Sequence, residues 1–226
     1  MHINGYNLIT KHRPESRGGG VALYIDSSLH FIERSDLNAM HITDTEQLFV
    51  TISLKHNINV NVGAIYSKPD KDIQLFNDSL SKLVDKIGCE KTMTFIAGDY
   101  NINLLKYENH SETNNFLNTM FEHHYFPLIT RPTRFSSNGS TLIDNIFTNC
   151  IKDKFSTGCL ISDISDHLPV YAILKNPIES HISKPSYTTI SSRHINDENL
   201  RKFECKLLDT DWNLSSYDIK TKFDVE

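Results

Sequence analysis

Two neighbouring stretches of the chain alternate between apolar and polar residues, and this pattern constrains the fold more than any other feature. The first covers residues 47–54 and the second residues 57–64, with only Lys55 and His56 between them. A period of two is typical of strands with one buried face. Because the break is so short, we expect an antiparallel hairpin. The apolar positions are Leu48, Val50, Ile52 and Leu54, then Ile58, Val60, Val62 and Ala64.

After Pro69 the period changes, and apolar residues recur at helical spacing over residues 73–87. This spacing predicts a helix with Asp70 or Asp72 as its N-cap and Gly88 as the glycine that stops it. Further patterns predict strands at 18–25, 92–97, 128–130, 141–148 and 168–174 and a second helix at 111–123. Hairpin strands mixed with helices, without strict strand and helix alternation, indicate an α+β protein in which helices cover a sandwich of sheets.

A change in composition divides the chain near residue 176. The stretch NPIESHISKPSYTTISS is polar and contains two prolines, which predicts a linker. A short amphipathic helix is expected at residues 197–208. We therefore expect a folded domain over residues 1–175, followed over residues 176–226 by a linker and a short helix.

The composition favours a folded, intracellular protein. Hydrophobic residues make up 38% of the chain and charged residues 23%, which is ordinary for a globular domain. The longest apolar run falls far short of the roughly 20 residues that span a membrane, so we expect no membrane partner. The four cysteines form no C-x-x-C motif, which argues against a zinc knuckle. The net charge of -5 is weak evidence against a DNA substrate, because a nuclease needs a carboxylate cluster and only one basic face.

Polar residues that could carry chemistry stand at the ends of predicted strands. They are Asp99 and Asn101 after the strand at 92–97, Asp144 in the strand at 141–148, and Asp166 and His167 before the strand at 168–174. Taken singly, each could be an ordinary turn or loop residue. Together they supply carboxylates for a hard cation such as Mg²⁺, and amide and imidazole donors for phosphate oxygens. The sharper hypothesis is therefore a site that cleaves phosphodiesters with the help of a metal.

Three competing kinds of site find less support. The glycine run at 18–20 is not followed by the Gly-Lys-Ser/Thr of a P-loop. The chain contains no Gly-x-Ser-x-Gly motif for a serine hydrolase. His123 and His124 lack a metal-type partner at helical spacing and are expected at the surface.

An ordered series of motifs resembles the endonuclease domain of jockey- and CR1-like non-LTR retrotransposons, within the endonuclease/exonuclease/phosphatase family of apurinic endonucleases and DNase I. The motifs are IYSKP, AGDYNIN, RPTRFSSNGSTLIDNIFTN and SDISDHLPVYAIL. The resemblance covers residues 5–175 and implies a DNase I-like four-layer α/β/β/α sandwich. The tail is similar to the segment that leads to a reverse transcriptase.

The resemblance implies roles in activating water and binding the substrate for four residues. Asp99 would align or activate the attacking water. Asn101 and Tyr66 would contact the scissile phosphate. Thr141 stands where related elements have a serine or threonine, and it would be a further substrate contact.

The remaining implied roles concern charge and metal. His167 would stabilise charge on the transition state, and Asp144 would orient its ring. Asp166 would help to hold the metal or the water, and Glu46 matches an acidic position that could be a further metal ligand. The implied cofactor is Mg²⁺, with Mn²⁺ as the alternative.

The implied partners are DNA and, in the full-length protein, the reverse transcriptase of the same element, which places an active enzyme in the nucleus. The family pattern also has an asparagine and a metal-binding glutamate on two earlier strands, and the given sequence contains neither. We therefore expect a fold that lacks the first strand-helix-strand, and reduced or absent nicking of target DNA. Two alternatives stay open: a catalytically inactive fragment that binds nucleic acid or protein, and a phosphatase acting on inositol lipids.

Overall fold

The computed structural model describes residues 2–12, 19–42, 44–137, 139–150, 154–175 and 197–209. The chain divides into two compact units, Met1–Ser183 and Lys184–Glu226. The predicted linker over residues 176–196 lies outside the described residues. In the second unit, α4 (Asp197–Asp209) confirms the predicted helix, and it exposes Leu200, Phe203 and Leu207 along one side.

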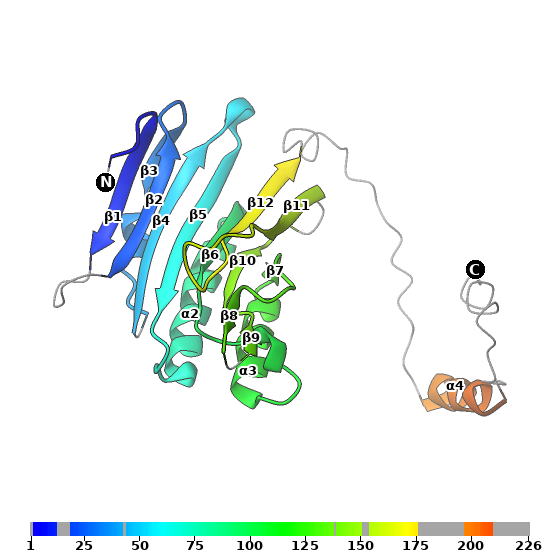
Figure 1. Cartoon of the computed structure of the whole chain (residues 1–226). Helices are drawn as coiled ribbons and strands as arrows, with labels where there is room; N and C mark the ends of the chain where they lie inside the picture. Colours follow the sequence, from blue (N-terminus) through cyan, green and yellow to red (C-terminus); the bar gives the residue numbers. More distant parts are fainter. Residues whose placement is uncertain are drawn as a thin grey trace. The chain divides into compact units, whose positions relative to one another are not determined.

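A six-stranded sheet forms the centre of the first unit (Figure 1). Its strands, in spatial order, are β3 (His30–Glu33), β4 (Thr45–Ser53), β5 (Asn59–Ser67), β6 (Met93–Asp99), β10 (Asp144–Thr148) and β7 (Phe126–Pro127). Only β5 and β6 run parallel among these neighbours, because α2 (Ile73–Gly88) connects them as a crossover. The antiparallel pairing of β4 with β5 confirms the predicted hairpin.

Three helices place their apolar residues in one core on one side of this sheet. They are α1 (Ser35–Asn38), α2 and α3 (Ser111–Glu122). The Asp72 carboxylate accepts the Leu75 N–H at 3.0 Å, so Asp72 is the N-cap of α2. The predicted role of Gly88 was wrong, because Gly88 is the last helical residue and the positive φ of 53° comes at Lys91.

Four aromatic rings form the centre of this core. Phe76 from α2, Phe116 from α3, Tyr100 after β6 and Phe147 from β10 are each at most 1% exposed. The Phe116 ring lies 5.5 Å from Tyr100 and 5.6 Å from Phe147, measured between centroids. This cluster fixes both helices against the strands that carry Asp99 and Asp144.

The opposite face of the sheet carries two separate two-stranded sheets. They are β1 (Tyr6–His12) with β2 (Gly20–Asp26), and β11 (Lys154–Cys159) with β12 (Val170–Lys175). The Phe155 ring of β11 packs edge-on against Phe95 of β6, with 5.9 Å between centroids. The predicted α+β class is confirmed, and the described residues show three of the four expected layers: helices, central sheet and second β layer.

Some predicted strands differ from the observed ones. The strand expected at 128–130 is wrong, since the paired residues are Phe126 and Pro127. The run expected at 141–148 is broken into β9 (Gly139–Thr141), which pairs with β8 (Arg134–Ser136), and β10. The break has a physical reason, because the backbone N–H groups of Leu142 and Ile143 bond side chains instead of a neighbouring strand.

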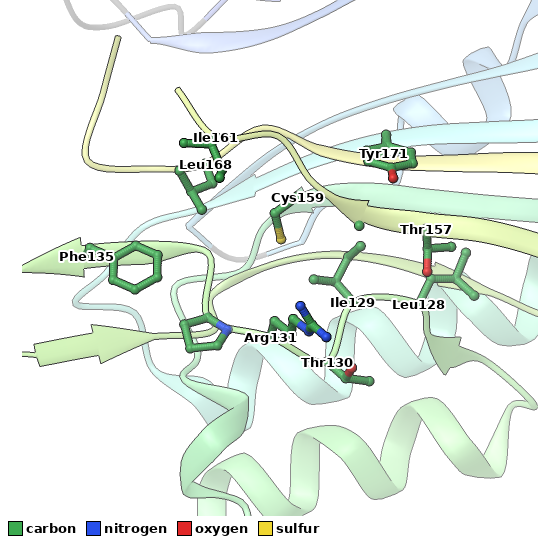
Figure 2. Close-up of a pocket in the computed structure, with 12 residues that line it drawn as sticks. Leu128, Ile129, Thr130, Arg131, Phe135, Thr157, Cys159, Ile161, Leu168 and Tyr171 are labelled. Atoms are coloured by element: carbon green, nitrogen blue, oxygen red, sulfur yellow. The ribbon is translucent and has the colours of Figure 1, made fainter. Parts of the chain in front are cut away.

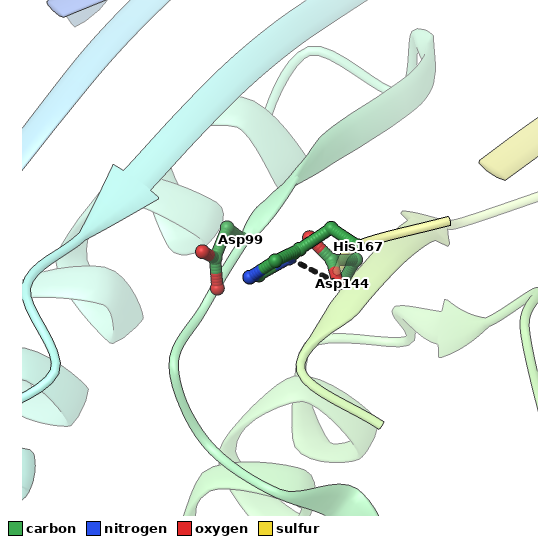
Figure 3. A group of neighbouring side chains, drawn as sticks. All are labelled: Asp99, Asp144 and His167. Atoms are coloured by element: carbon green, nitrogen blue, oxygen red, sulfur yellow. Dashed lines mark hydrogen bonds and ion pairs between the residues drawn. The ribbon is translucent and has the colours of Figure 1, made fainter. Parts of the chain in front are cut away.

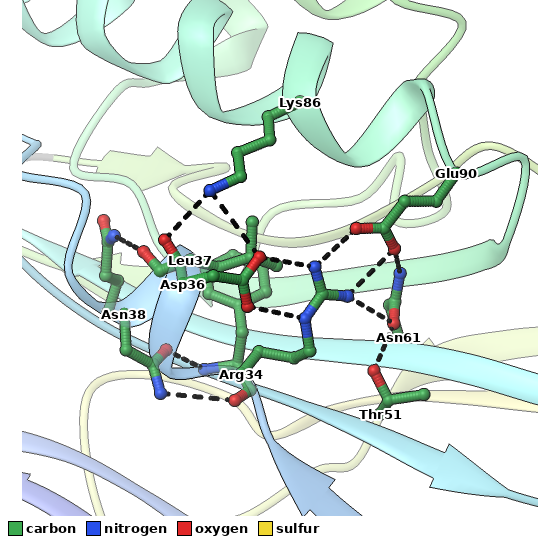
Figure 4. Close-up of polar contacts among 10 residues, drawn as sticks. Arg34, Asp36, Leu37, Asn38, Thr51, Asn61, Lys86 and Glu90 are labelled. Carbon is green, nitrogen blue, oxygen red and sulfur yellow. Dashed lines mark hydrogen bonds and ion pairs between the residues drawn. The ribbon is translucent and has the colours of Figure 1, made fainter.

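A polar network ties the start of β5 to two helices (Figure 4). The Arg34 guanidinium pairs with Asp36 in α1 and with Glu90 just after α2. Asn61 of β5 accepts a hydrogen bond from Arg34 and donates one to Glu90. These ion pairs hold the pKa of Asp36 well below its usual range, mainly through the hydrogen bond from Arg34. The network lies at one end of β5, whereas Tyr66 lies near the other.

Candidate active site

Four of the predicted site residues occupy one row across the central sheet. In the strand register, Glu46 of β4 pairs with Tyr66 of β5, Tyr66 with Asp99 of β6, and Asp99 with Asp144 of β10. Side chains directly opposite one another in a sheet point to the same face. The row lies on the face away from the helices, since the alternate positions Ile65, Ile96 and Phe147 belong to the helical core.

Asp99, Asp144 and His167 come together at the end of this row (Figure 3). Their donor atoms all lie within 4.8 Å of one another. The His167 Nδ1 lies 3.0 Å and 3.1 Å from the two carboxylate oxygens of Asp144. The Leu168 N–H donates to the Thr133 carbonyl at 2.7 Å, which holds the chain beside His167. Because Nδ1 faces Asp144, Nε2 is the imidazole atom left for a substrate.

Thr133 is a positioning residue that sequence reasoning missed. It is fully buried, and its hydroxyl donates to Asp144 Oδ2 at 2.7 Å. The Thr133 hydroxyl oxygen also accepts the backbone N–H groups of Ile143 and Asp144. Thr133 thus fixes the Asp144 carboxylate and the backbone at the start of β10. The motif Arg131-Pro132-Thr133-Arg134 contained this signal, but a threonine in a loop has no local pattern that reveals such a contact.

The turn that carries Asp99 and Asn101 is held by Ser67 at the end of β5 and by Lys71 a few residues further on. The Asn101 backbone N–H donates to Asp99 Oδ1 at 2.9 Å, and Asn101 has a φ of 48°. Its side-chain amide donates to the Ser67 carbonyl at 2.8 Å. The Tyr100 carbonyl accepts the Ser67 hydroxyl and the Lys71 ammonium, each at 2.6 Å. One of the two amide hydrogens of Asn101 is therefore already engaged within the protein.

The surroundings of Asp99 shift the pKa of its carboxyl. Burial raises the pKa of its carboxyl above the usual value, and the charge of Asp144 raises it further. The N–H of Asn101 and the positive charges of His167 and Lys71 act in the opposite direction. A carboxylate with a raised pKa is a stronger base than an exposed aspartate, as a group that accepts a proton from water needs to be.

The other predicted residues lie around the cluster rather than in it. The Asp166 carboxylate binds Arg134 Nε at 2.7 Å at the surface, and this hydrogen bond lowers the pKa of Asp166. The hydroxyl of Thr141 is buried and has no hydrogen-bond partner among the described residues. The Tyr66 ring is half-buried, and Glu46 is 9% exposed. Their predicted roles stay predictions.

A family model described as endonuclease-reverse transcriptase matches residues 60–171. The matched range contains Tyr66, the Asp99 turn and the whole cluster of Asp99, Asp144 and His167. Over residues 60–171 the chain is similar to this endonuclease-reverse transcriptase family. No curated protein matches the chain.

Solved structures share the fold of this endonuclease-type domain. The endonuclease domain of TRAS1, a telomere-specific non-LTR retrotransposon, is 16% identical with a TM-score of 0.58, and the match covers 76% of this chain and 81% of that structure. The human Nocturnin catalytic domain is 16% identical with a TM-score of 0.52, over 76% and 73% of the two chains. The catalytic domain of Xenopus laevis APE2 is 16% identical with a TM-score of 0.51, over 77% of each chain. These similarities establish a DNase I-like fold.

The donor set of the endonuclease-type domain fits a divalent cation. Asp99 and Asp144 offer carboxylate oxygens, and His167 lies next to them with its Nδ1 bound to Asp144. Mg²⁺ is usually held by one or two carboxylates together with substrate phosphates and water. Two carboxylates at the edge of a sheet are therefore sufficient protein ligands for such an ion. Within the described residues no helix is long and apolar enough to cross a membrane.

Lys71 in this endonuclease-type domain gives a pH-dependent prediction. Lys71 is 7% exposed, its ammonium lies 4.9 Å from the centre of the Phe76 ring, and burial lowers its pKa from 10.5 to about 8. Between these values the unfolded chain binds a proton that the folded chain has released, so stability rises with pH. Relative to Lys71→Met, the wild type should gain up to about 3 kcal/mol of unfolding free energy between about pH 8 and 10.5.

Urea denaturation followed by circular dichroism, at about pH 7 and again near pH 10, measures this difference. Lys82→Met is the matched control, because Lys82 is exposed on α2 and should show no such shift relative to the wild type. Parallel pH profiles for wild type and Lys71→Met would contradict the prediction.

Proposed function

We propose that this domain hydrolyses phosphodiester bonds in DNA with the help of a divalent cation, Mg²⁺ or Mn²⁺. The observation that carries the proposal is the cluster of Asp99, Asp144 and His167 at one edge of the central sheet. Two carboxylates, one of which can act as a base, and an oriented imidazole are groups that such a hydrolysis can use. The match of residues 60–171 to an endonuclease family supports the same reaction.

In this reaction Asp99 acts on the attacking water, and His167 acts on the phosphate. The oxygen of a water molecule attacks phosphorus, one P–O bond forms and the bond to the leaving oxygen breaks. Asp99 accepts the proton of the water, since burial has raised its pKa. His167, held through Nδ1 by Asp144, donates from Nε2 to a phosphate oxygen as negative charge develops there. A cation held by Asp99 and Asp144 would supply positive charge to the same phosphate.

Tyr66 and Asn101 flank the position of this phosphate. Tyr66 is the neighbour of Asp99 in the strand register, and its hydroxyl makes no hydrogen bond within the described part of the chain. Asn101 keeps one amide hydrogen beyond its bond to Ser67. We assign both as substrate contacts, with Glu46 and Thr141 as further polar groups along the same edge.

The family match supports a biological setting for this reaction. The matched family joins an endonuclease with a reverse transcriptase, and the TRAS1 domain of the same fold comes from a non-LTR retrotransposon. We propose that the domain nicks target DNA for retrotransposition in the nucleus, as part of a protein that also carries a reverse transcriptase.

Nicking of supercoiled plasmid in the presence of Mg²⁺ or Mn²⁺ tests the proposal. Asp99→Asn and His167→Ala should each lower the nicking rate by about 10²-fold to 10⁴-fold, because each removes a group that acts on a proton or on developing charge. Asp163→Asn is the matched control, since Asp163 is an exposed carboxylate in the same loop as His167 and should leave the rate unchanged. Equal rates for wild type and Asp99→Asn would mean that this cluster is not the active site.

Binding of nucleic acid without hydrolysis is the second candidate function. It is favoured by the position of Asp166, whose carboxylate pairs with Arg134 and so leaves only two carboxylates in the cluster. A wild-type protein that binds plasmid but does not nick it with either cation would support this candidate.

A further inference from the structure

A polar cavity of about 300 Å³ lies between α2 and α3, which pack side by side (Figure 1). Each helix contributes four of the residues that line it, and all eight are polar. Two of them carry carboxylates, Asp78 of α2 and Glu122 of α3. Among the described residues, no lysine or arginine lines this cavity. A cleft lined by charge of one sign attracts ions of the other, so the cavity favours a cation.

Asn77 is the observation that points to a ligand. It lines the cavity, is only 3% exposed, and belongs to the buried face of α2 with Phe76 and Leu80. Neither the oxygen nor the nitrogen of its amide has a hydrogen-bond partner within the described part of the chain. A buried polar group without a partner costs free energy, and native proteins rarely keep one unless water or a ligand satisfies it. A group bound in the cavity would supply that partner.

The lining offers free oxygen atoms more than free hydrogen-bond donors. The Gln74 amide donates to Asp78 Oδ1 at 3.0 Å, and the Asn118 amide donates to Asn114 Oδ1 at 2.7 Å. Within the described residues the amide oxygens of Gln74 and Asn118 accept no hydrogen bond, and the Glu122 carboxylate makes no hydrogen bond or ion pair. Free carboxylate and amide oxygens are the ligands that hard cations prefer.

The spacing of these residues brings their oxygens together. Gln74 and Asp78 are four positions apart in α2, and Asn118 and Glu122 are four positions apart in α3. Residues at this spacing are neighbours on one side of a helix, about 5–6 Å apart between Cβ atoms. Because all four line the same cavity, two oxygen-bearing pairs face one another across it. Inward-facing side chains on adjacent helices are how helical folds build metal sites.

A larger cavity in this domain has the opposite character. It measures about 610 Å³, lies between residues 128–132 and the β11–β12 hairpin, and has mainly apolar or aromatic walls (Figure 2). Its one charged lining residue is Arg131, which repels cations. Its lining residue Leu168 directly follows His167, so this cavity belongs to the surroundings of the proposed active site. Of the two cavities, the one between α2 and α3 has the charge and the donors for a cation.

We propose that the cavity between α2 and α3 binds a hard divalent cation through oxygens of Asn77, Asp78 and Glu122, and that Ca²⁺ fits it best. Ca²⁺ accepts about six to eight oxygen ligands in flexible geometry, whereas Mg²⁺ demands a nearly ideal octahedron. The amide oxygens of Gln74 and Asn118, together with water, complete the shell. Since a water occupies about 30 Å³, the volume holds an ion and several waters. The bound ion would tie α2 to α3.

Thermal unfolding of the full chain with Ca²⁺ alone tests the proposal. The protein carries Asp99→Asn, so that the pair of carboxylates in the catalytic cluster cannot account for the binding. A ligand that binds only the folded chain raises Tm, by about 5–10 °C at a hundred times Kd for a domain of this size. We expect this rise with Ca²⁺ and a smaller one with Mg²⁺. No rise at about 10 mM Ca²⁺, or equal rises with both ions, would overturn the proposal.

Charge-removing variants assign the binding to this cavity. Asp78→Asn and Glu122→Gln, each made in the Asp99→Asn protein, preserve side-chain shape and remove one charge. Each should weaken Ca²⁺ binding at least about tenfold in isothermal titration calorimetry, because affinity follows the number of charged ligands. Asp85→Asn is the matched control, since Asp85 is an exposed carboxylate of α2 that does not line the cavity. Equal Ca²⁺ affinities for these three variants would also overturn the proposal.

Asn77→Leu provides a second readout with two opposite shifts. Without Ca²⁺ the variant should have a higher Tm than its parent, because the substitution removes a buried amide that has no partner within the described residues. With Ca²⁺ its gain in Tm should be smaller, because one oxygen ligand is gone. A gain as large as that of the parent would show that Asn77 is not a ligand.

The outcomes separate this site from the proposed function, because Ca²⁺ binding is measured without DNA. A rise in Tm with Ca²⁺, in a chain whose wild type does not nick plasmid, would sustain this site and remove the hydrolysis. Nicking by the wild type, with no rise in Tm of Asp99→Asn on addition of Ca²⁺, would sustain the hydrolysis and remove this site.

Discussion

Replacing Phe116 with alanine is expected to lower the free energy of unfolding by about 3–5 kcal/mol, the usual cost of deleting a buried phenylalanine side chain. Phe116 is fully buried, and its ring lies 6.0 Å from Phe76 and 5.6 Å from Phe147, between centroids. The deletion would leave a cavity where α2, α3 and β10 meet, and rigid strands cannot close it. Because natural domains are stable by only about 5–15 kcal/mol, the variant would lose a large fraction of its stability.

Urea unfolding monitored by circular dichroism measures this loss. Phe121→Ala is the matched control on the same helix, since Phe121 is 41% exposed and its ring stacks on Phe126, outside the buried aromatic cluster. We expect that control to cost about 1 kcal/mol or less. A similar small cost for Phe116→Ala would mean that the aromatic cluster is not the centre of the core.

Replacing Gly98 with alanine is expected to cost on the order of 3 kcal/mol and to disturb the candidate site. A Cβ at this position would lie 1.9 Å from the carbonyl oxygen of Ile65 and 2.8 Å from its carbon. Both atoms belong to the backbone of β5, so relief requires that β5 and β6 move apart. Asp99 is the next residue and pairs with Tyr66 in that same ladder, so the row of site residues would be displaced with it.

Thermal unfolding and plasmid nicking together test the Gly98→Ala variant. Gly88→Ala is the matched control, because a Cβ at Gly88 would meet nothing within 4 Å. Alanine at that helical position should raise the free energy of unfolding by about 0.5–1 kcal/mol, since glycine loses more backbone entropy on folding. A Gly98→Ala protein as stable as the wild type would contradict the close approach of the two strands.

Local patterns predicted the elements of this fold where periodicity and capping agree. The alternation around residues 47–64 fixed the β4–β5 hairpin, and Asp72 with the helical spacing after it located α2. The position of β7 was predicted two residues too late, because its pairing with β10 extends over only two residue pairs. A strand this short leaves no alternation to detect.

The sequence indicated which residues could form the candidate site, but not how those residues are arranged in space. Asp99, Asp144 and His167 were chosen because they lie in predicted strands or next to their ends, whereas their meeting depends on the register of β6 with β10. Sequence reasoning missed Ser67, Lys71 and Thr133, because each acts through a hydrogen bond to a residue at least eleven positions away. No periodicity or capping rule encodes contacts of that range.

The side chains of the candidate site are held by two different β layers. The β11–β12 hairpin is a sheet of its own, and His167 stands just ahead of β12, while Asp99 and Asp144 belong to one hydrogen-bonded ladder of the central sheet. A local opening that releases this hairpin would withdraw the imidazole and leave the two carboxylates in place. Such partial openings require less free energy than global unfolding. The fraction of molecules with a complete site therefore depends on how firmly the hairpin docks and on the backbone contacts of residues 166–168 with residues 133–135. A protein that is folded by every global measure could still have its histidine displaced part of the time.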